Sequence, residues 1–139
     1  MTALTTIALL PLLLIVLSTT LELGALRVVA ARARSAADLA ALVAVNDQDD
    51  GELERTGRLR PAADASDVAR AMFAANLEPI AGTLAESPSA IAADAVVVIE
   101  DAPATVRLTA NVPVRTPVFG ALLFKPVTDI TVRASGSAR

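Results

Sequence analysis

Residues 1–21 read MTALTTIALLPLLLIVLSTTL and contain no charged side chain. A single carboxylate, Glu22, follows, and residues 23–45 then read LGALRVVAARARSAADLAALVAV, with no glycine or proline after Gly24. A run of this length, uncharged and mostly apolar, is enough for a helix to cross a hydrocarbon core of about 30 Å. We therefore expect a membrane helix that continues without a break into a helix outside the membrane.

The expected helix runs from about Thr2 to Asn46 and contains Pro11. Lipid tolerates such a proline because neighbouring groups or Ser/Thr side chains can satisfy the carbonyl that it frees. Beyond Gly24, apolar residues alternate in steps of three and four, which predicts packing against another helix or a sheet, in the same chain or in a neighbouring copy. These residues, which we call the alanine seam, are Leu26, Val29, Ala33, Ala36, Ala40 and Val43.

A second, polar stripe on the same helix contains Arg27, Arg34 and Asp38. Arg34 and Asp38 can form an ion pair one turn apart. No basic residue precedes Arg27, so a secretory signal peptide is a poor fit. If Met1 is the initiator, the positive-inside rule places the folded part in the cytoplasm; if a basic leader has been removed, the orientation reverses. The missing basic flank, and a methionine retained before threonine, favour removal.

Composition argues against enzymes and nucleic-acid binders. The chain of 139 residues has net charge −3 and contains no histidine, cysteine, tryptophan or tyrosine. It therefore lacks the commonest general bases, thiol nucleophiles, zinc ligands and base-stacking side chains. The remaining catalytic candidates form no recognisable spacing, and we predict neither enzymatic activity nor a cofactor. These candidates are Asp94, Glu100, Asp101 and Asp129, or a serine together with Lys125.

The pattern of residues 48–139 predicts a small head. Residues 48–61 are charged and turn-rich, and their acidic cluster (Asp47, Asp49, Asp50, Glu52) has the wrong register for a calcium loop, so we expect an exposed loop. A helix over residues 66–77, ended by Pro79, precedes a connector at 80–90. Alternation then predicts three antiparallel strands. These lie at 95–100, 105–114 and 128–134, with a turn at 101–103, helical turns or an apolar loop at 117–125, and a flexible tail at 135–139.

The expected fold is therefore α+β: a long hydrophobic N-terminal helix packed on a small three-stranded antiparallel sheet, with a second short helix. We divide the chain into an N-terminal membrane helix, residues 1–47, and a globular head, residues 48–139.

The N-terminal pattern resembles that of the TadE/TadG-like pilins of tight-adherence (Tad) pili, within the type IV pilin superfamily. The residues that carry the resemblance are Leu-Pro-Leu-Leu at 10–13, Glu-Leu-Gly at 22–24 and Ala-Ala-Asp-Leu-Ala-Ala-Leu at 36–42. The resemblance covers about 45 residues, and the length of the chain suits a short TadE-like form. It implies a non-catalytic pilus subunit that is stored in the inner membrane and then assembled by helix packing into an extracellular adhesive filament.

The resemblance also implies partners and site residues. The partners are other copies of the chain in a helical filament, a prepilin peptidase and an inner-membrane assembly platform. Met1 would be the first residue of the processed chain, and Thr5 stands where pilins carry a glutamate. The first arginine is Arg27, whereas in the family an arginine often follows Glu-Leu-Gly directly. The candidate assembly residues are Met1, Thr5, Pro11, Glu22, Gly24, Arg27, Arg34 and Asp38.

Two readings of Glu22 remain open. Its carboxylate lies solvated at headgroup level, or it meets an arginine or an N-terminal amine of an adjacent subunit. In the second case, Glu22→Ala should leave membrane insertion intact and impair assembly. The alternative for the whole chain is a single-pass membrane-anchored protein whose head binds a partner.

Overall fold

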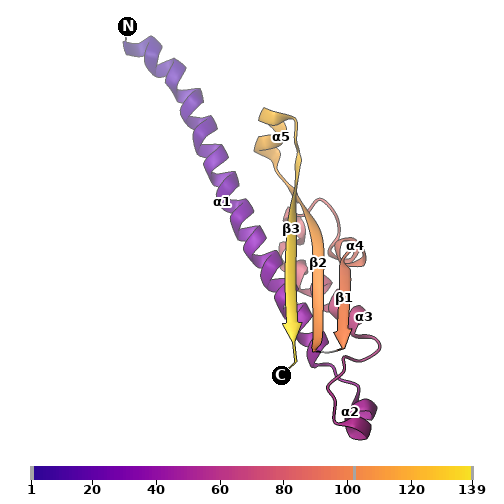
Figure 1. The fold of residues 1–139 in the computed structure, drawn as a ribbon. Coiled ribbons are helices and arrows are strands. Elements are labelled where there is room, and N and C mark those ends of the chain that lie inside the picture. Colours follow the sequence, from indigo (N-terminus) through magenta and orange to yellow (C-terminus); the bar gives the residue numbers. More distant parts are fainter. Residues whose placement is uncertain (1, 102, 139) are drawn as a thin grey trace.

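The computed structural model describes the backbone of residues 2–101 and 103–138, and side chains from residue 9 onward. Helix α1, Thr2–Asn46, is one continuous α-helix that includes Pro11, as predicted. Figure 1 shows its N-terminal part projecting alone, whereas its C-terminal part lies against the head. Met1 lies outside the described residues, and so does the side chain of Thr5.

The head contains a three-stranded antiparallel meander with the strand order β1-β2-β3. The strands are β1, Val96–Asp101, β2, Ala104–Arg115, and β3, Val127–Ser137. Strand β2 alternates as the sequence predicts: Val106, Leu108 and Val112 are buried, while Arg107 and Asn111 are exposed. This alternation fixes which face of the sheet packs on the helices, because successive side chains of a strand point to opposite faces.

One face of the sheet is covered by α1 and by α3, Ala65–Leu77 (Figure 1). The hydrophobic core joins the C-terminal half of α1 to the head. Most residues of the alanine seam are buried in this core, together with Phe73 and Leu77 of α3, which are fully buried. The seam's last member differs from the prediction: Val43 is exposed, and Ala44 and Val45 are buried instead. Alternating steps of three and four average 3.5 residues, whereas an α-helix has 3.6 residues per turn. The side of the helix that such a pattern marks therefore shifts gradually around the helix along its length.

Three segments between the predicted elements contain short helices. Helix α2, Asp50–Thr56, lies in the exposed segment expected to be a loop. The 3-10 helix η1, Glu78–Thr83, and helix α4, Pro88–Ala93, occupy most of the expected connector. Helix α5, Pro117–Leu123, confirms the helical alternative for its segment. Caps explain α2 and α4, because the side chains of Asp49 and Ser87 accept hydrogen bonds from first-turn backbone N–H groups.

The prediction of a flexible C-terminal tail is wrong for residues 135–138. Ser135, Gly136 and Ser137 extend β3 and pair with Arg107, Val106 and Thr105 of β2. The N–H of Ala138 then donates to the carbonyl of Ala104. These small residues fit because β3 lies very close to α1: a Cβ atom on Gly136 would lie 2.6 Å from the carbonyl oxygen of Ala41.

Candidate functional site

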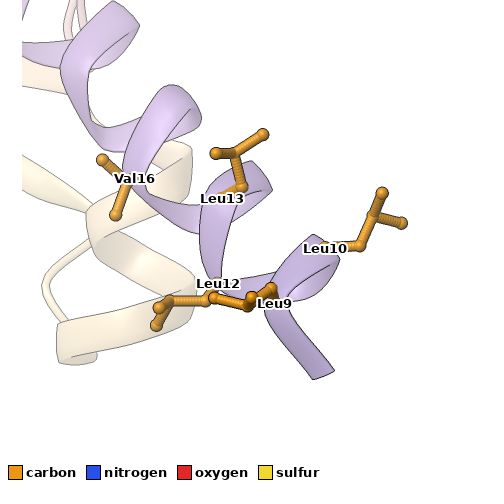
Figure 2. Close-up of a pocket in the computed structure, with 5 residues that line it drawn as sticks. All are labelled: Leu9, Leu10, Leu12, Leu13 and Val16. Carbon is orange, nitrogen blue, oxygen red and sulfur yellow. The ribbon is translucent and has the colours of Figure 1, made fainter. Parts of the chain in front are cut away.

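The N-terminal part of α1 is an apolar surface that the head leaves uncovered. From Leu9 to Leu17 every side chain is exposed, and so is Leu21. Figure 2 shows leucines and a valine of this segment on one helix, and the residues that line the hollow there all belong to α1. By length and composition α1 could cross a membrane. Such a surface needs lipid or other helices around it, because water disfavours contiguous exposed apolar area of this extent.

The polar groups of this segment bond to their own helix. The hydroxyl of Thr19 donates to the carbonyls of Ile15 and Val16, each at 2.9 Å, and the hydroxyl of Thr20 donates to Val16 at 2.7 Å. A hydroxyl that bonds back to the helix carbonyls presents little unpaired polarity to its surroundings. This part of α1 therefore suits an apolar environment despite its Ser-Thr-Thr sequence.

Glu22 marks the end of this segment and contacts the head directly. One carboxylate oxygen accepts a hydrogen bond from the backbone N–H of Val118 at 2.9 Å, and the other accepts one from Phe119 at 2.7 Å. The side chain is buried, with the residue only 9% exposed. The structure of the single chain therefore does not show the solvated position at headgroup level, which was one of the two interpretations of the sequence. Both oxygens are already bonded within the chain.

The two N–H groups belong to the first turn of α5, which begins with Pro117. The first N–H groups of a helix have no partner within it, and they favour a negative charge. Thr116 precedes the helix but its side chain does not cap it; its hydroxyl instead donates to the carbonyl of Lys125 at 3.0 Å. Glu22 thus supplies the cap from α1 and holds α5 against that helix. We call this contact the Glu22 clasp.

A second apolar feature runs along the side of α1 that faces away from the head. Residues in steps of three or four share one side of a helix, and at 100° per residue this set lies opposite the buried alanines. Every member is exposed, both before Glu22 and beyond it. We call it the outward stripe: Leu10, Leu14, Leu17, Leu21, Gly24, Val28, Ala31, Ser35, Leu39 and Leu42.

Gly24, on this stripe, has no packing role within the chain, because a Cβ atom there would meet nothing within 4 Å. Arg27, Arg34 and Asp38 are exposed elsewhere on α1. The ion pair that was possible between Arg34 and Asp38 is absent: within residues 9–101 and 103–138, the four ion pairs use other residues. Arg34 instead borders a hollow beside residues 130–133 of β3.

The acidic cluster near residue 50 serves local structure. Asp49 caps α2, and Glu52 forms an ion pair with Arg55. The hydrogen bond from Arg55 lowers the pKa of Glu52. Among the residues that the structure describes, no group of three or more acidic side chains is placed to hold a metal ion.

The catalytic candidates do not come together in one place. Glu100 pairs with Arg107, and Asp101 pairs with Arg60, each at 3.4 Å. Asp94 and Asp129 border another hollow, beside the sheet. Lys125 lies at the opposite end of the head, directly after α5.

Comparison with known proteins identifies the N-terminal region. A family model for Flp pilus-assembly proteins of the TadE/G-like type matches residues 1–47. The matched segment is α1 with one residue on either side of it. The resemblance read from the sequence is therefore confirmed for this helix, which covers about a third of the chain. No curated protein and no solved structure matches the chain.

Proposed function

We propose that this protein is a structural subunit of a Tad-type pilus. Helix α1 holds it in the cytoplasmic membrane before assembly and packs against other copies in the extracellular filament afterwards. Lipid surrounds the segment before Glu22 in the first stage, and neighbouring helices replace that lipid in the second. The match of residues 1–47 to TadE/G-like Flp pilus-assembly proteins supports a role in this kind of pilus. The prepilin peptidase and the assembly platform are the partners that such a family implies.

The observation that carries the proposal is the outward stripe beyond Glu22. A membrane explains exposed leucines before Glu22, but not the exposed Val28, Leu39 and Leu42, which follow it on the same side of α1. The alanine seam cannot supply the contact between copies, since the chain's own head buries Ala33, Ala36 and Ala40. Helix-to-helix packing between copies would therefore use the outward stripe.

Val28→Asp is expected to lower incorporation into filaments. Val28 is 55% exposed, so the substitution leaves the subunit's own core intact. Burying a valine contributes about 1.5–3 kcal/mol, and each 1.4 kcal/mol is a factor of about ten, so the filament fraction should contain about ten-fold less of the variant. The measurement is an immunoblot of sheared filaments against the membrane fraction.

The matched control is Val98→Asp on the outer face of the sheet. Val98 is 47% exposed and lies opposite Arg107 in the β1–β2 pairing, where an aspartate is tolerated. Equal incorporation of both variants would contradict packing along the outward stripe. A wild-type chain that stays in the membrane fraction of piliated cells would favour the alternative, a membrane-anchored protein whose head binds a partner.

Gly24→Ala separates stability from assembly. Because nothing surrounds the added Cβ atom, alanine should stabilise α1 by about 0.5–1 kcal/mol over glycine. The thermal midpoint of the detergent-solubilised chain should therefore rise or stay level. If a neighbouring helix packs closely at Gly24, incorporation into filaments falls at the same time. Unchanged incorporation would show that no neighbour approaches this position.

A further inference from the structure

The tip of α5 exposes three consecutive large apolar side chains. Leu122, Leu123 and Phe124 are 42%, 68% and 92% exposed. Phe124 also has a positive φ of 53°, which is uncommon for an aromatic residue and unfavourable in the free chain. The ring is therefore open to the surroundings and is not packed in the core of the head. We call these three residues the α5 tip.

Helix α5, which carries the α5 tip, packs against α1 where the exposed apolar segment of α1 ends. The Glu22 clasp fixes the start of α5 at the level of residue 22. At 1.5 Å per residue, the backbone from Thr2 to Glu22 spans about 30 Å, the thickness of a hydrocarbon core, so Glu22 lies close to the membrane boundary. Figure 1 shows α5 at the end of the head that reaches farthest toward the N-terminus of α1.

Charge around α5 suits a lipid surface. Residues 116–124, TPVFGALLF, are uncharged, and they lie between Arg115 and Lys125, the only lysine of the chain. Both of these side chains are exposed. Long cationic side chains on either side of an apolar segment can reach phosphate headgroups while the segment itself enters the apolar layer. Two of the three phenylalanines of the chain, Phe119 and Phe124, belong to this short segment.

The surface between α5 and α1 is also apolar. A groove there is lined by Leu21, Leu26 and Val29 of α1 and by Pro117 and Val118 of α5. It joins the exposed part of α1 to α5, and its surface is mainly apolar although Glu22 and Arg115 also line it.

We propose that the α5 tip inserts into the interfacial layer of the membrane that holds α1, with Arg115 and Lys125 at the level of anionic headgroups. The occupant of this surface is lipid, and the contact gives the stored subunit a second attachment that sets the tilt of the head on the membrane. The inference rests on the membrane-held stage of the proposed function.

Single-tryptophan variants test this directly, because the chain contains no tryptophan or tyrosine. The full chain carrying Phe124→Trp is reconstituted in vesicles of phosphatidylethanolamine and phosphatidylglycerol. We expect blue-shifted emission and quenching by lipids brominated near the glycerol end of the acyl chain. The matched control is Leu59→Trp, at an exposed position near α2 and the opposite end of the head, which should be quenched by aqueous iodide instead.

Leu14→Trp reports separately whether α1 is inserted. Lipid quenching at residue 14 together with iodide quenching at residue 124 would overturn the α5 proposal and leave the proposed function intact. A residue 14 that is open to iodide would overturn both. Varying the protein-to-lipid ratio distinguishes lipid from a second copy of the chain as the occupant. If the tryptophan of Phe124→Trp is shielded from iodide only at a high ratio and loses this shielding on dilution with lipid, a second copy covers the α5 tip and the lipid proposal is wrong.

Discussion

Glu22→Ala is expected to release α5 from α1 while the sheet stays folded. The substitution removes both acceptors of the Glu22 clasp and leaves the N–H groups of Val118 and Phe119 without a partner. A buried N–H left unpaired costs about 1–3 kcal/mol, and hydrogen bonds to a charged acceptor are the stronger kind. Amide hydrogen exchange at these two residues should therefore accelerate by about ten-fold or more in the detergent-solubilised chain. Membrane insertion is unaffected, because the change removes a charge.

Glu22→Gln distinguishes the two uses of this side chain. Glutamine keeps one acceptor oxygen, so exchange at Val118 and Phe119 should lie between wild type and Glu22→Ala. If the role of Glu22 in assembly is to pair with an arginine or an amine of a neighbour, glutamine and alanine should impair filaments equally, since both remove the charge. If its role is to hold α5, glutamine should be the milder variant. Unchanged exchange in Glu22→Ala would disprove the clasp.

The regular elements were predictable because each has a local signal. The apolar run and its continuation without glycine or proline predicted α1 from Thr2 to Asn46, as observed. Alternation predicted the meander, because each strand has one buried face. The TadE/G-like resemblance was also local, and the family match covers the same residues.

The contacts that join distant segments had no such signal. Glu22 lies 96 residues before Val118 and 97 before Phe119, and the sequence around either end contains no pattern that indicates the contact. The partners of Glu22 are backbone N–H groups, which every residue but proline carries, so no residue type in the sequence pointed to them. The sequence therefore suggested only lipid headgroups or a neighbouring subunit as the surroundings of this carboxylate. The short helices α2 and α4 were missed for a different reason: they are too brief for a period to emerge.

The prediction for the C-terminal residues was wrong because composition alone does not distinguish a flexible tail from a strand that needs small side chains to pack closely on a helix. Ser-Gly-Ser-Ala is typical of a flexible end, since small polar residues bury little apolar area. In the fold the same smallness lets β3 approach α1, where Gly136 lies against the backbone of Ala41, itself a small residue. Small residues on both sides make the contact close, and this makes it sensitive to one added methyl group.

Gly136→Ala is therefore expected to destabilise the head. The added Cβ atom would lie 2.6 Å from the carbonyl oxygen and 2.9 Å from the carbonyl carbon of Ala41, and neither atom can move without moving α1. Overpacking of this kind costs about 1–3 kcal/mol or more. The lower chain entropy of alanine in the unfolded state offsets only about 0.4–1 kcal/mol of that cost. The measurement is the thermal midpoint of the full chain in detergent, which should fall by several degrees.

Ser135→Ala is the matched control, because Ser135 is the neighbouring residue of β3 and faces solvent. Surface changes of this kind usually stay within about 0.5 kcal/mol. A midpoint that falls for Gly136→Ala and not for Ser135→Ala locates the cost in the contact between β3 and α1. Equal midpoints would mean that β3 separates from the helix at little cost, and that residues 135–138 add little to the stability of the head.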